Sequence, residues 1–399
     1  MSNASLVNLK RHIINIMTLR YDPLEPPSFR LRNWQDFLPQ EYENPNKKLE
    51  ELVKKVLEEK VISEGYRKVA IALSGGLDST FILNMLRKIS SNIKINAICA
   101  TFRDIYDETE KAEKIAKKYR CSFHIVEIND PFVKLRELIR ITGEPRWNLY
   151  FYYVLEEASK DNDIILTGDG GDELFGGYIF RYHKFLSNLK EEDCWKEKVI
   201  NYIECHERDW VPDQEKLFGT RMNFKWDEIY ELLRHYFDNP LNPLDQVFLA
   251  DFNGKLVFDW IPTNRKLSKY LDVEYFAPFL EEEIIDFATH LPNRYKYDYK
   301  SNIGKKILRD ILECENIFLD FQKIGFGMDL PRIWEKTGKS WFNLYLSSNS
   351  VVVNNGIVNE EWLKKAYEKA TFEKSPRYIN KLLSILSLEI WLREFNLKV

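Results

Sequence analysis

Cysteine is scarce in this chain, and its pattern carries no pairing signal. There are five cysteines, an odd number, and no C-x-x-C pair. A disulfide framework and a cysteine-ligated zinc site are therefore not expected, and this usage fits the reducing cytoplasm. The cysteines are Cys99, Cys121, Cys194, Cys205 and Cys314.

The sequence also lacks an excess of one charge and a long apolar run. The 58 basic and 62 acidic residues give a net charge of −4, so no overall field favours nucleic acid or an anionic membrane. No segment approaches the roughly 18 apolar residues of a membrane span, and Met1 to Ser5 has no apolar signal core. The six histidines form no H-x-x-E-H or i, i+4 pattern, so core or solvated roles are expected for them.

What remains is an ordinary globular composition, with 44% hydrophobic and 30% charged residues. A length of 399 residues suits two or three domains, or one large α/β domain with appendages. Five prolines between residues 21 and 45 predict an irregular stretch there. Together with a strand or short helix expected at 6–20, it makes up an N-terminal arm over 1–45. We expect an α/β region over 46–190 and a mostly helical region over 191–399.

Alternating strand and helix patterns set the expected fold class. Short apolar runs predict four strands, at 69–73, 95–101, 123–128 and 164–167. Helical spacing lies between them, at 79–89, 107–119, 131–141 and 149–160. Strands separated by helices of about ten residues predict a parallel sheet with helices on both faces. Beyond residue 190 helical patterns dominate, and 380–395 reads as an amphipathic helix.

The loop after the first strand, SGGLDST at 74–80, leads directly into a helix. Two glycines and a helix N-terminus suit a bound anion. A carboxylate at Asp78 suits phosphates only when a divalent metal bridges the two. The lysine of the Walker P-loop is absent. The alternative is a plain turn in which Asp78 or Ser79 caps the helix.

The loop after the fourth strand, TGDGGDELFGGY at 167–178, holds five more glycines beside three carboxylates in close succession. The carboxyl ends of parallel strands share one rim of a sheet, where ligands bind. Asp78 and Asp172 are therefore predicted to hold one metal between them. The alternative is that Asp172 and Glu173 merely begin a helix.

Together these two loops resemble the synthetase half of glutamine-dependent asparagine synthetase, within the PP-loop ATP pyrophosphatases. The resemblance covers roughly 60–395 and implies the adenine-nucleotide-hydrolase-like PP-loop fold, with 46–190 as its ATP-binding region. Weaker matching patches follow in the family's order: Tyr106-Asp107-Glu108, Glu144-Pro145, Val273-Glu274, Pro278-Phe279-Leu280, Leu291-Pro292 and Lys323-Ile324-Gly325-Phe326.

The resemblance implies acyl-adenylation with ATP and Mg²⁺, followed by attack of ammonia or another amine to form an amide. The residues it assigns to pyrophosphate and metal are Ser74, Gly75, Gly76, Asp78, Ser79 and Asp172. It assigns the adenosine pocket to Leu73, Phe102 and Gly168. Asp169 would accept the proton of the attacking ammonia, Lys323 would neutralise charge on the phosphates, and Glu274 would border the pocket for the substrate acid.

Several positions depart from the family's pattern in the part expected to shape the acid pocket. Phe321 and Phe276 stand where the family has arginine, and Arg265-Lys266-Leu267-Ser268 replaces Asp-Arg-x-Ser. After Glu144-Pro145, Asn148 and Tyr150 stand for the usual Asp and Ser. The ATP loops are intact, so the resemblance predicts ATP chemistry more firmly than it predicts aspartate as the substrate.

The family's glutaminase domain carries its cysteine nucleophile at position 2, where this sequence has Ser2, so we expect no glutaminase activity of that kind. Free ammonia, a separate glutaminase subunit or another amine would then supply the nitrogen, and a homodimer is compatible with the resemblance. Two other hypotheses stay open: an inactive scaffold subunit that binds ATP, and a PP-loop enzyme that modifies tRNA.

Overall fold

The computed structural model describes residues 3–103, 108–315, 317, 328–346 and 350–399. Its centre is a five-stranded parallel sheet in the order β3-β2-β1-β4-β5. The strands are β1 (Lys68–Ala72), β2 (Lys94–Thr101), β3 (Ser122–Glu127), β4 (Ile164–Leu166) and β5 (Glu274–Phe276). The four predicted strands are confirmed. The fifth strand was not predicted.

Strand order places a topological switch point in the middle of the sheet. The chain runs outward from β1 to β2 and β3, and then returns to add β4 on the other side of β1. Ala70 and Ile71 of β1 pair with Ile165 and Leu166 of β4. In open α/β sheets the crevice at such a point is where ligands bind.

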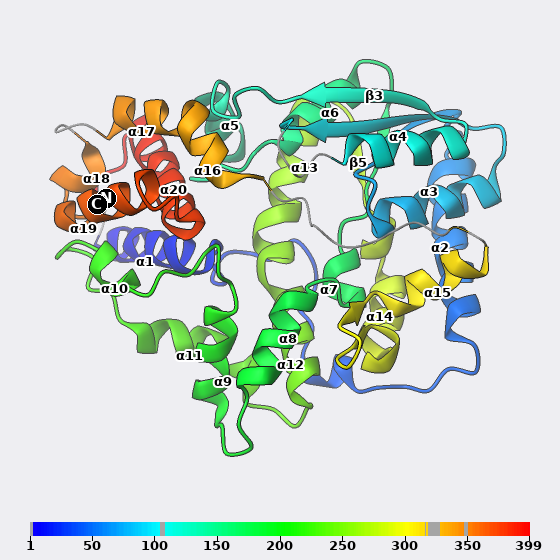
Figure 1. Ribbon diagram of the computed structural model, residues 1–399, viewed down its shortest axis with the longest axis horizontal. Helices are drawn as coiled ribbons and strands as arrows, with labels where there is room; N and C mark the ends of the chain where they lie inside the picture. The colour runs from blue at the N-terminus through cyan, green and yellow to red at the C-terminus, as the bar shows by residue number, and fades with distance from the viewer. Residues whose placement is uncertain (1–2, 104–107, 316, 318–327, 347–349) are drawn as a thin grey trace.

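Helices cover both faces of the sheet, as predicted (Figure 1). Side chains of a strand alternate between faces, so Val69 and Ile71 join one core and Ala70 joins the other. The first core includes α2 (Pro45–Leu57), α3 (Leu77–Ile89) and α4 (Thr109–Lys118). The second includes α5 (Leu135–Thr142), α6 (Phe151–Ser159) and α13 (Ile261–Tyr270).

From residue 171 onward the chain is mostly helical, and this includes the region 191–399 for which the sequence predicts helices. Besides α13, the helices described there include α7 (Gly171–Phe175), α8 (Ile179–Asn188), α9 (Trp195–Glu204), α10 (Gln214–Leu217), α11 (Trp226–Phe237), α12 (Pro243–Asp251), the π-helical η3 (Phe252–Trp260), α14 (Glu282–His290), α15 (Lys306–Cys314), α16 (Leu330–Ile333), α17 (Lys339–Tyr345), α18 (Val351–Asn354), α19 (Glu360–Thr371) and α20 (Pro376–Glu394). A short hairpin, β6 (Tyr297–Asp298) and β7 (Ile303–Gly304), precedes α15.

The N-terminal segment forms a helix, α1 (Asn3–Leu19), which resolves the choice between strand and helix. It packs beside α20 at the helical end of the molecule (Figure 1). The arm that follows is irregular except for the single turn η1 (Trp34–Phe37). Asn253 fixes this arm to η3, since its side chain accepts a hydrogen bond from the Arg32 amide (2.9 Å) and donates one to the Arg32 carbonyl (2.7 Å).

The last long helix differs from the amphipathic helix that was predicted. Residues on all sides of α20 are buried, because α1, α5, α16, α17, α18 and α19 surround it. Even Glu389 is fully buried, and its two carboxylate oxygens accept hydrogen bonds from the amides of Val351 and Val352, both at 2.9 Å. These two amides begin α18, where a negative charge is favoured.

Among the helices described here, none combines the length and the apolarity that crossing a membrane would require.

Replacing Glu389 tests whether this buried carboxylate holds α18 against α20. Glu389→Ala would leave the amides of Val351 and Val352 and the guanidinium of Arg393 without this acceptor, and is expected to lower the free energy of unfolding by about 3 kcal/mol. Urea denaturation followed by circular dichroism measures the change. The exposed Glu368 of α19 supplies the matched variant, Glu368→Ala, which should change stability by less than about 0.5 kcal/mol. Equal effects of the two substitutions would contradict this role.

Candidate active site

The two glycine-rich loops follow the neighbouring strands β1 and β4, on the same rim of the sheet. They touch at Gly168, where a side-chain carbon, if one were added, would lie only 2.7 Å from Cβ of Asp78 and 2.9 Å from the amide nitrogen of Ser79. Gly170 has a positive φ of 89°, which turns the chain into α7. Glycine thus allows the second loop to lie directly against the start of α3.

The structure brings Asp78 and Asp172 together, as predicted, and places a lysine between them. The Nζ atom of Lys305 forms ion pairs with Asp78 and with Asp172, the latter at 2.6 Å. Burial alone would lower the pKa of this lysine, but the two carboxylates outweigh it and raise the pKa above its usual value. The amide of Lys305 also donates to the carbonyl of Phe175 (3.0 Å), which ties the cation to the second loop.

The donor set at this point fits a divalent cation. Two carboxylates from different loops already converge on one positive charge, and hard carboxylate oxygens are the ligands that Mg²⁺ prefers. Asp78 and Asp172 are the residues that would hold the ion.

The start of α3 has the geometry expected of an anion site. Its N-cap is Gly76, with no side-chain capping bond, so neither Asp78 nor Ser79 acts as the cap. The hydroxyls of Ser79 and Thr80 instead donate to the Gly76 carbonyl, at 3.4 and 2.7 Å. Ser74 accepts a hydrogen bond from the Gly76 amide at 3.3 Å. The first turn of this helix therefore presents main-chain N–H groups toward the rim.

Asp169 sits beside this cluster in an aromatic setting. Its carboxylate accepts hydrogen bonds from Trp260 Nε1 (2.8 Å), Thr167 Oγ1 (2.9 Å) and the hydroxyl of Tyr275. Burial raises the pKa of Asp169, the charge of Asp172 adds to the rise, and the three hydrogen bonds oppose it. A carboxyl group with a raised pKa is a better proton acceptor than an exposed one.

The residues predicted to line an adenosine pocket lie along the same rim. Leu73 follows β1, Phe102 follows β2 and Gly168 lies just beyond β4. The Phe102 ring contacts Tyr150 edge-on, with 5.8 Å between centroids, and Tyr150 lies 6.3 Å from Trp260. An aromatic wall therefore runs from the end of β2 toward Asp169.

The structure corrects the prediction for Glu274. This residue begins β5 and pairs with Ile164, the first residue of β4, so it lies on the rim opposite the two loops. There it forms an ion pair with Lys60 (2.5 Å) and accepts a hydrogen bond from the Tyr66 hydroxyl (2.7 Å). The predicted residue Lys323, with the patch around it, lies outside the described residues, as do Tyr106 and Asp107 of the patch Tyr106-Asp107-Glu108.

Three residues of the cluster were missed from the sequence: Lys305, Trp260 and Tyr275. Lysine is ordinarily solvated, and Lys305 is separated from Asp78 by 227 positions, so no local pattern marks it. Trp260 and Tyr275 read as core aromatics. Their indole N–H and phenol O–H groups need hydrogen-bond partners when buried, and this need was the one indication in the sequence that they contact a polar site.

A separate pocket also borders the second loop, through Glu173 and Tyr178. Its other walls come from α1, α8, α9 and η3. The charges in these walls are largely paired: Arg181 with Asp251 (2.9 Å), and Lys255 with Asp209. Burial and the charge of Asp172 raise the pKa of Glu173 to about 7.

Filling the space at Gly168 tests the contact between the loops. Gly168→Ala would push Asp78 and Ser79 away and is expected to cost about 1–3 kcal/mol of stability. Thermal and urea unfolding measure the loss. Gly338 lies in a helical segment where an added carbon meets neighbours only at 3.4 Å, so Gly338→Ala is the matched variant and should not destabilise. A stable Gly168→Ala protein would mean that the loops do not touch as described.

The chain matches known proteins over most of its length. The asparagine synthase family model matches residues 48–393. The chain is 21% identical over 354 residues to asparagine synthetase (glutamine-hydrolyzing) 1 of Bacillus subtilis, covering 80% of this chain and 55% of that protein. It is 31% identical over 324 residues to a putative asparagine synthetase (glutamine-hydrolyzing) of Mycobacterium bovis, covering 71% of this chain and 48% of that protein.

The chain therefore spans about half the length of these relatives. Among solved structures, the NH3-dependent NAD synthetase of Campylobacter jejuni matches with 18% identity and a TM-score of 0.26, over 33% of this chain and 60% of that one.

Proposed function

The chain belongs to the asparagine synthase family, and we propose that it is an ATP-dependent carbon–nitrogen ligase that forms an amide through an acyl-adenylate. The observation that carries this proposal is the convergence of Asp78 and Asp172 on one cation, beside the open N-terminus of α3. A triphosphate needs both features, because main-chain amides bind its oxygens and a divalent ion neutralises its charge.

In the proposed first step, an oxygen of the substrate carboxylate attacks the α-phosphorus of ATP, and the bond to the β-phosphate oxygen breaks. Pyrophosphate leaves, and the acid becomes a mixed anhydride with AMP. Ser74, Gly75, Gly76 and Ser79 bind the departing phosphates. Magnesium held by Asp78 and Asp172 would supply charge neutralisation for the leaving group.

Two lysines supply further positive charge. Lys323 is proposed to neutralise charge that builds on the phosphates, the role its motif implies. Lys305 is placed to act on the same charge, since its ammonium group lies between the two metal-binding carboxylates. A cation that is held in position before the reaction stabilises the transition state without a cost of reorganisation.

In the second step, the nitrogen of ammonia or another amine attacks the acyl carbon, and AMP leaves. Asp169 accepts the proton that the nitrogen loses. Its raised pKa supports this role. The aromatic side chains around it, Trp260, Tyr275 and Phe151, limit access of water that would otherwise hydrolyse the anhydride.

Leu73, Phe102 and Gly168 are proposed to border the adenosine. Aspartate or a related acid is proposed as the carboxylate. Phe276, which stands where the family has arginine, is buried at the end of β5, on the rim that carries both loops. Among these acids, that loss of positive charge favours one that carries less negative charge than aspartate besides the reacting carboxylate.

The exchange of radiolabelled pyrophosphate into ATP, measured with a panel of carboxylic acids, tests the first step. Asp78→Asn and Asp172→Asn should each reduce the exchange by at least 100-fold while circular dichroism stays unchanged, because each substitution removes a metal ligand and leaves the packing intact. The exposed Asp161 lies at the opposite rim, and Asp161→Asn should exchange normally. Normal exchange in either loop variant would refute the shared metal site. AMP formation that requires tRNA, or no exchange with any acid, would refute the ligase.

A second experiment tests Lys323 as a group that acts in the transition state. Lys323→Ala is expected to lower kcat by 100- to 1000-fold, about 3–4 kcal/mol, while the Kd for ATP changes less than tenfold. Single-turnover kinetics and equilibrium titration separate the two effects, and Lys336→Ala on the helical segment η6 (Trp334–Gly338) serves as a matched substitution. A loss confined to ATP binding would mean that Lys323 is only a ground-state ligand.

A further inference from the structure

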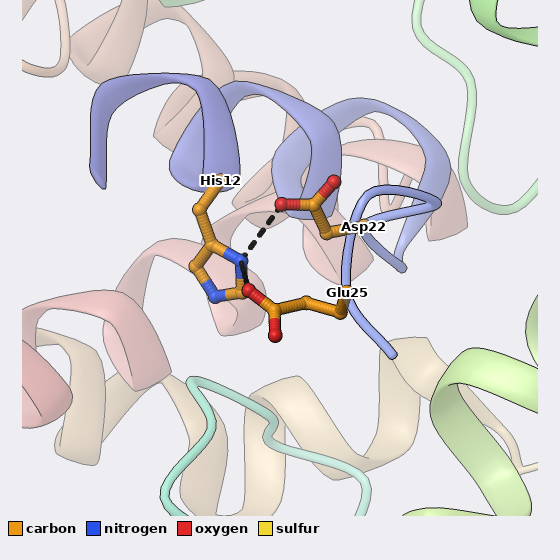
Figure 2. A group of neighbouring side chains, drawn as sticks. All are labelled: His12, Asp22 and Glu25. Carbon is orange, nitrogen blue, oxygen red and sulfur yellow. Dashed lines mark hydrogen bonds and ion pairs between the residues drawn. The ribbon is translucent and has the colours of Figure 1, made fainter. Parts of the chain in front are cut away.

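A second group of acidic side chains gathers around His12 of α1, away from the two loops. Asp22 and Glu25 lie just beyond the end of this helix, and both carboxylates face the imidazole ring (Figure 2). The Nδ1 atom of His12 is 3.0 Å from Oδ2 of Asp22 and 3.6 Å from Oε1 of Glu25. Among the residues that the structure describes, these three offer ligand atoms within 4.8 Å of one another.

The orientation of Asp22 is fixed by contacts of its other oxygen. Oδ1 accepts hydrogen bonds from Asn15 Nδ2 (2.7 Å) and from the amide of Leu24 (3.1 Å). The side chain is only 5% exposed. Oδ2 is therefore directed at His12 by a rigid, buried support, as metal ligands usually are.

The second ring nitrogen of His12 has a carboxylate of its own. Oε2 of Glu144, in the turn after α5, lies 3.4 Å from Nε2. This oxygen is buried, and apart from the ion pair with His12 the structure gives it no hydrogen-bond partner. A histidine that binds metal through one ring nitrogen normally donates the other N–H to such a carboxylate, which fixes the tautomer and the ring.

The charges around His12 favour a cation. Three carboxylates approach a single imidazole. A histidine binds a metal ion only through a deprotonated ring nitrogen, so an ion that binds at Nδ1 releases any proton held there to solvent.

We propose that Nδ1 of His12, Oδ2 of Asp22 and Oε1 of Glu25 bind one zinc ion, with Glu144 accepting a hydrogen bond from Nε2. Zinc bonds of 2.0–2.1 Å in a tetrahedral arrangement separate the ligand atoms by about 3.3 Å, and the two separations seen here bracket that value. The fourth position is left for water, because Glu25 is half exposed and the site faces solvent on that side.

The site would join α1 to the turn that follows it, and through Glu144 to the end of α5. The three ligands precede residue 48, where the family match begins, so the site belongs to a part of the chain outside that match. Local spacing gave no indication of it, since the ligands are separated by 10 and 3 positions with a helix end between them. This inference does not rest on the proposed ligase activity.

Zinc binding to the full chain, without an affinity tag and after treatment with a chelator, tests the proposal. Isothermal titration should detect one equivalent with a Kd in or below the micromolar range, and cobalt(II) should give a visible absorption band of tetrahedral intensity. His12→Gln and Glu25→Gln should each abolish the high-affinity equivalent. Because Glu25 is half exposed, its variant remains informative even if His12→Gln fails to fold. Glu144→Gln should weaken binding by 10- to 100-fold.

His124 provides the matched control, because its Nδ1 also lies near one carboxylate, Glu157, at 3.7 Å. His124→Gln should retain the full equivalent. Measuring all variants in an Asp172→Asn background separates this site from the two loops. The proposal is refuted if the wild-type chain binds no zinc under these conditions, if Glu25→Gln binds as tightly as wild type, or if His124→Gln loses the same equivalent.

Discussion

The candidate site depends on one electrostatic constraint: two carboxylates from different loops must be held close together in a place with little water. Asp78 and Asp172 would repel each other if nothing positive lay between them, and Lys305 supplies that charge. A buried ion pair of this kind contributes little net stability, because desolvation cancels most of the attraction. Its effect here is positional. It fixes the spacing of two acidic groups that belong to different loops.

Glycine makes that spacing attainable. Any side chain at Gly168 would overlap Asp78, so the close approach of the loops is available only to this residue. The sheet contributes the rest, since β1 and β4 are neighbours that end on the same rim. The close contact between the two loops thus depends both on the strand order and on the glycine at position 168.

Much of this arrangement could be predicted from the sequence, because its signals are local. An apolar run followed by SGGLDS and a helical stretch identifies a strand, a turn and a helix within about 20 residues. The strand order was not readable from the sequence. The resemblance put Glu274 beside the acid pocket, whereas this residue begins β5, on the rim opposite the two loops. Lys305 escaped notice because pairing across 227 positions leaves no local pattern. The burial of α20 on all sides arises from helices contributed by distant segments.

The position of the Lys305 side chain depends on the hairpin β6–β7, which directly precedes it. Gly304 of the hairpin packs against Ile179, and the next residue, Lys305, adopts a left-handed φ of 55° before α15 begins. Its amide is bonded to the carbonyl of Phe175 in the second loop. Lys305 and the hairpin are therefore fixed to the second loop by these contacts. A local opening that separates the hairpin from the second loop would also move the Lys305 ammonium group away from Asp78 and Asp172. Ordering of the hairpin is therefore coupled to the pairing of Lys305 with these two carboxylates.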